Sequence, residues 1–547
     1  MLEEHATIED TIPLTKCNSL GAMSPKTNLA MRGKQSPYTK KLLFILLGAM
    51  SVLLYFMFHT TGQSIAGEEN IFLDKDRSNA YNVRILPASL SDSELHELPS
   101  NSFSYLAMID AGSSGCRAHI YRYGKLGTIS GPLYILPNHV SKKVKPGLSS
   151  FASHASDAGE SLQGLVDFMK VNVPESEWAT TPIWLKATAG LRMVTETERN
   201  DILGSVSSFL GNRAKSPFLF RKSWAKVIPG SEEGGFGWIA YNYLKKIIGP
   251  KKTGKEDPYA VVEMGGASLQ VSQVAQTEKD IAQIPDKYLF QFDIEGESFT
   301  LYTYSYLGYG GEQARENLNK YYLESNSHRL KDKNGIKDTC LNPGFIRPAT
   351  EERQEPYQGP AGSYNVHGSS TDKGSTCETA MQSLFTPSTE MKSNENCEDD
   401  GPYSFKCVYQ PDFVKASKNF LVFENFFYIA SAIGVKQASD IQSNEKAAFP
   451  LVTTPKNFKT ASEQVCAKSW SELESDYPLD KSCEKCNQKW CFGATYASLF
   501  LTNGIGMDEN KKITIQKEVD GSEIEWALGA AYKEASDFLK RTNLRPT

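Results

Sequence analysis

The sequence predicts an α/β fold, and two observations carry that prediction. Short apolar runs that suit buried strands alternate with helical patterns, the clearest of which spans 236–248. Two glycine-rich turns, 110–115 and 263–268, each follow an apolar run and precede an alternating one, so each predicts a β-hairpin. Both turns begin with an acidic residue followed by small residues, although they lie far apart in the chain. We therefore expect two similar lobes whose hairpin tips face each other across a cleft.

The N-terminal part of the chain is predicted to form a tail, an anchor and a stem. Residues 1–41 are polar, which predicts a disordered cytoplasmic tail, and 59–102 form a charged stem. Residues 42–58 carry no charge, and 17 residues are at the short end of the range for a membrane span. Basic residues precede this run and acidic residues follow it, so the positive-inside rule predicts a single-pass type II membrane protein. The alternative is a signal peptide cleaved near 64–66, for which the leader before the apolar run is long.

The composition is that of a folded globular protein, with 40% hydrophobic and 22% charged residues among 547. The formal net charge is −5, so no basic excess points to nucleic acid. The pairs Lys142-Lys143 and Lys251-Lys252 are typical of a solvated surface. Between about 103 and 539 the chain is expected to fold, with a surface insertion rich in Pro, Gly, Ser and Thr at 348–390. The oligomeric state is not fixed by these features.

The ten cysteines favour an oxidising compartment. Cys17 would be cytoplasmic, and Cys116 follows the first glycine-rich turn. The other eight fall in the C-terminal half, and their even number predicts four disulfides: Cys340, Cys377, Cys397, Cys407, Cys466, Cys483, Cys486 and Cys491. The alternatives are a redox-active Cys483/Cys486 pair, or a zinc site that these two form with Cys466 and Cys491.

The two glycine-rich turns predict a site for a phosphate chain and a divalent cation. Glycine lets the backbone approach a ligand closely, and consecutive N–H groups in such a turn form a nest for anions. A bare carboxylate beside a phosphate would repel it, so Asp110 and Glu263 predict a cation between them. Two further turns of small residues follow apolar strands, at 187–192 and at 229–235.

Hydrolysis of a phosphoanhydride also needs a positioned water and a group that takes its proton. Glu233 is the candidate base, because it lies just before the helix expected from about Phe236, and a helix N-terminus favours an ionised carboxylate. The alternative is that Glu232 and Glu233 are a solvated pair of acids. Ser268 and Gln270 occupy alternate positions of the second hairpin, so both can face the cleft and hold a water, although such residues are more often plain turn residues.

Aromatic residues at 423–428, with Trp526 further on, suit either stacking on a nucleobase or a hydrophobic core, and we expect core for most of them. His119 and the other seven histidines show no metal-ligand spacing and receive no role.

Five segments together resemble the signature regions of the ecto-nucleoside triphosphate diphosphohydrolase (apyrase) family, which includes Golgi nucleoside diphosphatases. They are 110–117, 186–192, 230–238, 263–270 and 490–496, in family order, and 301–310 and 526–529 add to the likeness. The resemblance covers about 103–535. It implies two RNase-H-like lobes of the actin and hexokinase type with an active-site cleft between them: 103–228 with 515–540 returning to it, and 229–514.

The resemblance also implies roles at the matching positions. Terminal phosphate binding falls to Ser113, Ser114, Gly115, Arg117, Thr188 and Ala189, and binding of its neighbour falls to Gly265, Gly266 and Ala267. Asp110 and Glu263 would hold Ca²⁺ or Mg²⁺, mainly through waters. Glu233 would be the general base, and Ser268 and Gln270 would position the water. Base binding falls to Phe427 and Trp526. The family pairs Cys397 with Cys407 and Cys466 with Cys491 in its cell-surface branch.

Three positions depart from the family pattern. Glu263 stands where Asp is usual, Cys116 replaces a hydroxyl residue, and Gly115 lacks an imidazole found in some members. We interpret them as tuning of the metal and substrate preference.

The implied function is hydrolysis of terminal phosphates of nucleoside tri- and/or diphosphates by in-line attack of water, without a covalent intermediate. The expected location is the Golgi or secretory-pathway lumen, or the cell surface. The alternatives are a sugar-type kinase of the same superfold and a catalytically impaired nucleotide-binding ectodomain.

Overall fold

The computed structural model describes residues 83–325, 335–347, 365–370, 376–385, 403–435, 449–476 and 486–542. The chain divides into two units, 1–79 and 80–547. The predicted tail and the apolar run 42–58 lie outside the described residues. Among the helices that are described, none combines the length and the apolar character needed to cross a bilayer.

The first sheet contains β1 (Ile85–Leu86), β2 (Ser104–Ala111), β3 (Cys116–Leu126), β4 (Leu133–Ile135), β5 (Val140–Val144), β6 (Ile183–Ala187) and β7 (Ala225–Val227). Its order is β1-β3-β2-β6-β7, and β4 and β5 also pair with β3. The central strand β2 runs antiparallel to β3 and parallel to β6.

The second sheet repeats this arrangement. It contains β8 (Ala260–Met264), β9 (Ser268–Val274), β10 (Leu289–Ile294), β11 (Glu297–Leu307), β17 (Phe420–Glu424), β18 (Leu451–Thr453) and β19 (Ile513–Ile515), in the order β10-β11-β9-β8-β17-β19-β18. Here β8 runs antiparallel to β9 and parallel to β17. Every residue of β8 is buried, as expected for an interior strand. The expected α/β fold is confirmed, and each sheet has one hairpin at its centre.

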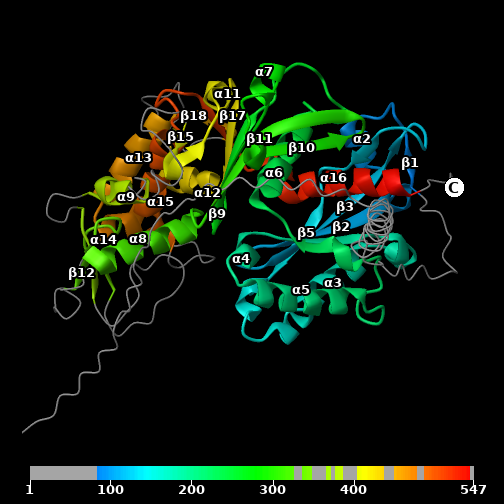
Figure 1. Ribbon diagram of the computed structural model, residues 1–547, viewed down its shortest axis with the longest axis horizontal. Coiled ribbons are helices and arrows are strands. Elements are labelled where there is room, and N and C mark those ends of the chain that lie inside the picture. The colour runs from blue at the N-terminus through cyan, green and yellow to red at the C-terminus, as the bar shows by residue number, and fades with distance from the viewer. Residues whose placement is uncertain are drawn as a thin grey trace, which may run out of the picture. The chain divides into compact units, whose positions relative to one another are not determined.

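Two helices, α6 (Gly230–Leu244) and α16 (Trp526–Arg541), pack together between the sheets (Figure 1). A buried cluster joins their apolar residues to Met108 of the first sheet and Leu421 of the second. The helices approach closely because position 529 is glycine: any side chain there would meet the Phe236 carbonyl oxygen at 2.0 Å. The Lys186 ammonium of β6 also bonds the Glu534 carboxylate, so α16 is tied to the first sheet.

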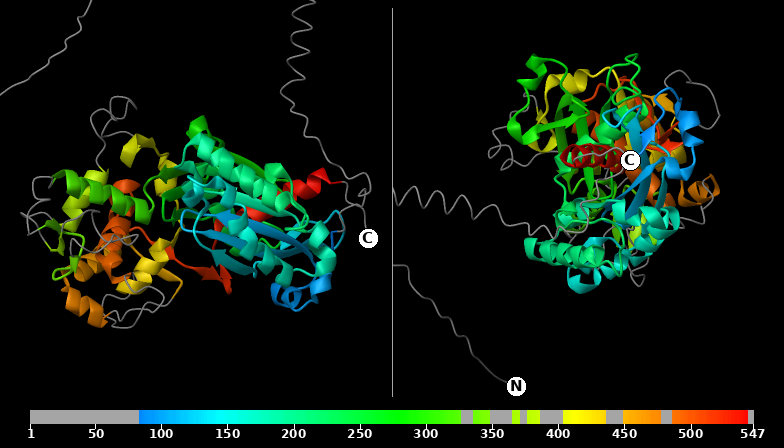
Figure 2. Two further views of the ribbon diagram at one scale, coloured as in Figure 1. Left: turned by 90° about the horizontal axis from the view of Figure 1, so that it is seen from below. Right: turned by 90° about the vertical axis from the view of Figure 1, so that its right-hand side faces the viewer.

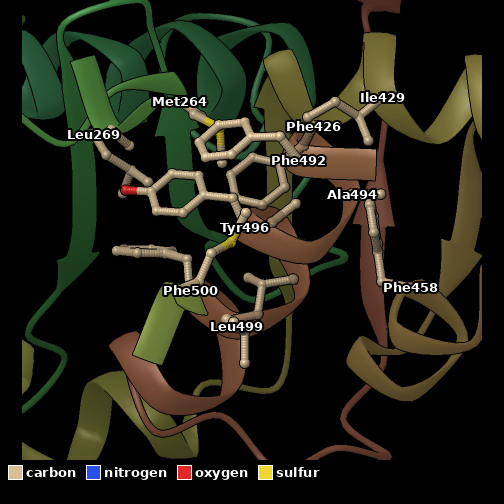
Figure 3. Close-up of a cluster of buried hydrophobic side chains, with 14 of the residues drawn as sticks. Met264, Leu269, Phe426, Ile429, Phe458, Phe492, Ala494, Tyr496, Leu499 and Phe500 are labelled. Atoms are coloured by element: carbon tan, nitrogen blue, oxygen red, sulfur yellow. The ribbon is translucent and has the colours of Figure 1, made fainter. Parts of the chain in front are cut away.

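The outer faces are covered by other helices (Figures 1 and 2). Against the first sheet lie α3 (Gln163–Asn172) and α5 (Glu196–Gly211), and α5 begins with a capping box of Thr195 and Glu198. The second sheet carries α8 (Gly311–Ser325), α9 (Cys377–Phe385), α12 (Asn425–Ile433), α13 (Pro455–Ala467) and α15 (Trp490–Leu499). Figure 3 shows their core, in which Phe426, Phe492 and Tyr496 pack with Met264 and Leu269.

Smaller elements connect these layers. They are α2 (Asp92–His96), α4 (Ala189–Arg192), α7 (Glu278–Ile281), α11 (Asp412–Ala416), α14 (Trp470–Asp476), β12 (Ile336–Asp338), β13 (Ile346–Arg347), β14 (Val366–Gly368), β15 (Tyr403–Ser404), β16 (Val408–Tyr409), β20 (Glu518–Val519) and β21 (Ser522–Glu523).

The predicted stem differs from the structure over its second part. Residues 83–102 belong to the folded body, since β1 pairs with β3 and Leu86 and Leu95 are buried against Phe103 and Tyr134. The charged residues of this segment made it look like a stem, although Leu86 and Leu95 attach it to the folded body.

Two of the predicted disulfides are present, Cys340–Cys377 and Cys466–Cys491. Cys407 is also disulfide-bonded, while Cys17, Cys397, Cys483 and the side chain of Cys486 lie outside the described part of the chain. The bond between Cys466 and Cys491 makes the alternative zinc site wrong, because both thiolates that it needs are consumed. Cys116 is buried and forms no disulfide.

Candidate active site

The two predicted hairpins are present, and their turns are built alike. In the first turn the Gly112 N–H donates to the Gly115 carbonyl at 3.0 Å, and in the second the Gly265 N–H donates to the Ser268 carbonyl at 3.0 Å. In both turns the acidic residue lies two positions before the donating glycine. Each tip therefore presents the same short stretch of backbone after a carboxylate.

The tips face each other. A side chain on Gly266 would meet Ser113 Oγ at 3.3 Å, so the second tip lies directly against the first. The turn after β6 reaches the same place, since a side chain on Gly190 would meet Ser113 Cα at 2.9 Å. Together they enclose a cavity of about 160 Å³.

Most of the residues expected at the site line this cavity: Asp110, Ser113, Ser114, Gly115, Arg117, Thr188, Ala189, Glu233, Glu263, Gly265, Gly266, Ala267, Ser268 and Trp526. The cavity is also lined by four residues that were not expected at the site: His119, Lys143, Glu424 and Glu525. Of the expected residues, Gln270 and Phe427 lie away from the cavity wall.

Glu233 lies in the first turn of α6, because the helix begins at Gly230 and not near Phe236 as the apolar pattern suggested. Glycines in this turn let the helix lie tightly on the second sheet: a side chain on Gly234 would meet Ser272 Oγ at 2.6 Å. The Glu233 side chain is buried, and its Oε2 accepts a hydrogen bond from Arg192 Nη2 at 2.7 Å. Burial raises the pKa of Glu233, and Arg192 opposes that rise.

Ser268 is joined to the same network. Its Oγ accepts one hydrogen bond from Arg192 Nη2 at 3.1 Å and another from Gln270 Nε2 at 2.6 Å. A hydroxyl oxygen that accepts two hydrogen bonds has its own proton left to donate elsewhere, and Ser268 lines the cavity. Gln270 therefore acts behind Ser268, where its amide also reaches Ser305 Oγ at 3.1 Å.

Glu263 is buried and Asp110 is half-buried, and acidic side chains outnumber basic ones in the cavity wall around them. Asp110 Oδ1 and Glu263 Oε2 have no hydrogen-bond partner within the described part of the chain. Burial, with the negative charges of Glu233 and Glu525, raises the pKa of Asp110 to about 7, although His119 works against this. Burial and four neighbouring carboxylates raise the pKa of Glu263 well above its ordinary value. Orphaned carboxylate oxygens in such a place suit a hard divalent cation.

Glu424 and Glu525 add two more carboxylates to the wall. Glu424 ends β17 with φ 58° and ψ −122°, a strained conformation for a residue other than glycine. Burial, and then the charge of Glu525, raises the pKa of Glu424 to about 7. Burial alone would raise the pKa of Glu525, but His119 and Arg117 lower it below its ordinary value. Neither Glu424 nor Glu525 could be assigned to the site from the sequence, because neither lies in a glycine-rich turn.

Arg117 and Lys143 supply the positive charge of the wall. Arg117 forms an ion pair with Glu525, and its Nη1 lies 3.9 Å from Glu523 Oε2. Lys143 Nζ donates to Ser114 Oγ at 3.0 Å, and burial, with nearby Arg117, lowers its pKa. Lys142 and Lys143 are both exposed, as expected for a solvated surface, and Lys143 also reaches the edge of the cavity.

One departure from the family pattern, Gly115, has a steric explanation, and another, Cys116, lies outside the cavity. A side chain on Gly115 would meet the Val144 carbonyl oxygen at 2.5 Å, so the first tip has no room for an imidazole. Cys116 is 1% exposed, and burial, with the charge of Asp110, raises the pKa of its thiol to about 12. Its side chain packs in the core of the first sheet and is outside the cavity lining.

The two residues expected to bind a base are both packed. Trp526 is 6% exposed and stacks on Phe236, with ring centroids 6.5 Å apart. Phe427 packs on Phe449, with ring centroids 4.5 Å apart. Their role in base binding remains a prediction.

Comparison with known proteins agrees with this geometry. The profile of the GDA1/CD39 (nucleoside phosphatase) family matches residues 96–547. A guanosine-diphosphatase of Schizosaccharomyces pombe is 29% identical over 447 residues, which cover 79% of this chain and 74% of that protein. The nucleoside diphosphate phosphatase ENTPD5 of Homo sapiens is 28% identical over 436 residues, covering 79% of this chain and 88% of that protein. A crystal structure of nucleoside triphosphate hydrolases from Neospora caninum has a TM-score of 0.52 at 14% identity, covering 80% of this chain and 93% of that one, which establishes a shared fold.

Proposed function

This chain belongs to the GDA1/CD39 (nucleoside phosphatase) family, and we propose a reaction for it. We propose that the protein hydrolyses the terminal phosphoanhydride bond of nucleoside tri- and/or diphosphates with a divalent cation. The observation that carries the proposal is the meeting of two acid-and-glycine hairpin tips with buried Glu233 in one cavity. The sheets would then be the centres of two RNase-H-like lobes, which their shared strand order supports, with α16 returning to the first.

Asp110 and Glu263 would hold Ca²⁺ or Mg²⁺, mainly through waters. Their orphaned oxygens fit such an ion, and water-mediated contact tolerates the longer side chain of Glu263. The ion supplies neutralisation of the phosphate charge when it is bound.

The turns of the cavity would bind the phosphates. Backbone N–H groups and hydroxyls of Ser113, Ser114, Gly115, Thr188 and Ala189 face the terminal phosphate, and those of Gly265, Gly266 and Ala267 its neighbour. Lys143, already bonded to Ser114, would add a cationic contact.

Glu233 would take the proton of the attacking water. Arg192 fixes one oxygen of the carboxylate, and Ser268 has its hydroxyl proton available to donate to the water oxygen. The water then attacks in line, its proton passes to Glu233, and no covalent phosphoenzyme forms.

The test is Glu233→Gln. This variant keeps the shape of the side chain and removes the basic oxygen, so we expect turnover to fall by about 10²–10⁴-fold while nucleotide binding persists. Glu232→Gln is the matched control, because that neighbour pairs with Lys226 at 3.1 Å. If Glu233→Gln releases phosphate as fast as the unmodified protein, Glu233 is not the base.

The same assay addresses the two alternatives. Phosphate release without an acceptor excludes the sugar-type kinase, whereas nucleotide binding without release in the unmodified protein, with Ca²⁺ or Mg²⁺ present, identifies an impaired ectodomain. The disulfides support a lumenal or extracellular site of action. Anchoring through 42–58 is part of the same proposal.

A further inference from the structure

Two histidines and a glutamate form a compact cluster beside the cavity, and two of the three, His119 and Glu525, line it. No histidine has a metal-ligand spacing in the sequence. His119 lies on β3, His139 lies between β4 and β5, and Glu525 directly precedes α16. His119 Nδ1 lies 3.0 Å from His139 Nε2 and 2.8 Å from Glu525 Oε2, and His139 Nε2 lies 3.7 Å from that same oxygen. The three atoms form a triangle whose corners can all bind one ion.

The size of the triangle suits a transition metal. Ligand bonds of 2.0–2.1 Å in tetrahedral geometry separate two ligand atoms by about 3.4 Å, and the three observed separations bracket that value. Two imidazole nitrogens with one carboxylate oxygen favour Zn²⁺ and its neighbours over Mg²⁺ and Ca²⁺, which prefer oxygen ligands.

The three facing atoms of the cluster have fewer protons between them than are needed to pair each atom by a hydrogen bond. His139 Nδ1 lies 3.3 Å from the Pro137 carbonyl oxygen, which can only accept, so this contact places the proton on Nδ1 and a lone pair on Nε2. That carbonyl is the kind of outer contact that orients a metal-binding histidine. His119 Nδ1 has at most one proton for its two acceptor neighbours. Arg117 bonds the other oxygen of Glu525, and Oε2 is buried without a hydrogen bond of good geometry.

The surroundings also favour a cation. The side chains of His119 and His139 are 1% and 5% exposed, and Glu525 is 9% exposed. The cavity is lined by five carboxylates, including Glu525, and by two cationic side chains, Arg117 and Lys143, so negative charge is in excess around the cluster. Bulk water is therefore largely excluded from a place where positive charge is in deficit.

We propose that His119 Nδ1, His139 Nε2 and Glu525 Oε2 bind a Zn²⁺ ion, separate from the cation held near Asp110 and Glu263. Three protein ligands leave the fourth tetrahedral position to water. The ion joins β3 and the segment before β5 to the residue that begins α16. It thereby fixes Glu525 and the Arg117 that pairs with it.

The full chain, stripped with a chelator and then dialysed against ZnCl₂ with excess Mg²⁺, is expected to retain about one zinc ion, measured by mass spectrometry of the metal content. His139→Gln is expected to lose it. His154→Gln is the matched control, because His154 is exposed and bonds Ser153. Equal zinc retention in the unmodified protein and His139→Gln overturns the proposal, as does the absence of tightly held zinc in the unmodified protein.

A second measurement protects the test against a variant that fails to fold. Co²⁺ in the unmodified protein is expected to give the visible absorption of a tetrahedral site, and X-ray absorption at the zinc edge is expected to show two imidazole ligands. An all-oxygen, six-coordinate environment contradicts the proposed site. Neither measurement depends on nucleotide hydrolysis, so failure of this proposal is distinguishable from failure of the proposed reaction.

Discussion

At the residue scale, Arg192 is the side chain on which the geometry of the proposed base depends. One of its terminal nitrogens donates to Glu233 and to Ser268, and the other donates to the Ile228 carbonyl at 3.3 Å. The guanidinium thus holds the base and the water-positioning hydroxyl at a fixed separation. Arg192 is absent from the cavity lining, so we assign it a positioning role.

Arg192→Lys keeps the charge but loses the planar guanidinium, whose Nη1 bonds the Ile228 carbonyl and so orients the Nη2 that donates to Glu233 and Ser268. We expect kcat to fall by about 10–10²-fold with little change in KM, since the loss falls on the attacking water and not on the nucleotide. Steady-state phosphate release measures both constants. Arg199→Lys is the control, because Arg199, in the nearby α5, donates to the Val194 carbonyl at 3.4 Å and is outside the cavity lining. An increase in KM alone contradicts the positioning role and makes Arg192 a substrate contact.

At the scale of elements, α6 brings Glu233 to the cleft because glycine replaces larger residues on the face that meets the second sheet. A side chain on Gly234 would meet both Ser272 Oγ and Thr303 Oγ1, at 2.6 and 2.8 Å, and these two hydroxyls bond each other at 2.7 Å. The position of the first turn is thereby set by backbone packing against β9 and β11. Helix propensity alone would disfavour so many glycines.

Gly234→Ala is expected to push the first turn of α6 off the sheet, which lowers the free energy of unfolding by about 1–3 kcal/mol and lowers kcat. The matched control is Gly204→Ala in α5, where a new side chain meets nothing within 4 Å. There the better helix former should raise the free energy of unfolding by about 0.5–1 kcal/mol. Urea unfolding compares the two, and equal stabilisation by both changes contradicts the tight packing of α6.

At the scale of the whole folded body, the cleft gathers carboxylates from both sheets and from the segment before α16. Asp110, Glu233, Glu263, Glu424 and Glu525 line one cavity. Asp110 and Glu424 have a pKa of about 7, and the pKa of Glu263 is raised further above its ordinary value. Asp110, Glu263 and Glu424 therefore bind their protons more tightly in the folded chain than in the unfolded one, whereas Glu525 binds its proton less tightly.

Between about pH 4 and pH 7 Asp110, Glu263 and Glu424 hold more protons in the folded chain than in the unfolded one, so these three groups make stability fall as the pH rises through that window. A divalent cation replaces the protons, so Mg²⁺ or Ca²⁺ should raise the melting temperature by a few degrees at about pH 8, and by less at about pH 5. Calorimetry with and without a chelator measures this. The double variant Asp110→Asn with Glu263→Gln should be more stable than the unmodified protein at about pH 8 without cation, and insensitive to the cation. A cation effect that is larger at the lower pH would contradict the carboxylate site.

Patterns of neighbouring residues predicted those parts of the site that consist of consecutive residues. The hairpin tips could be found because the residues that make each turn are consecutive. Strand alternation correctly placed Ser268 in the cavity wall, whereas Gln270 lies behind it and bonds its hydroxyl. The α/β class and the facing of the tips are confirmed. The beginning of α6 was placed too late, because the glycines that pack its first turn carry no apolar pattern.

What escaped prediction depends on distant segments. His119 and His139 are brought together by pairing of β3 with β4 and β5, and Glu525 arrives from nearly the far end of the chain. Glu424 lies within an aromatic run. Its distinguishing feature is a positive φ angle, which the composition of the run does not reveal. The membrane anchor, the assigned catalytic roles and the nucleobase contacts remain predictions.

The wall formed by Glu525, Trp526 and Ala527 has a consequence for the order of events during synthesis. The turns that would grip phosphate are translated early, but a nascent chain still on the ribosome lacks this last side of its pocket. A prematurely terminated product would therefore carry recognisable signature segments and yet lack Glu525, the ion-pair partner of Arg117, so the pocket is complete only when the last helix has been made.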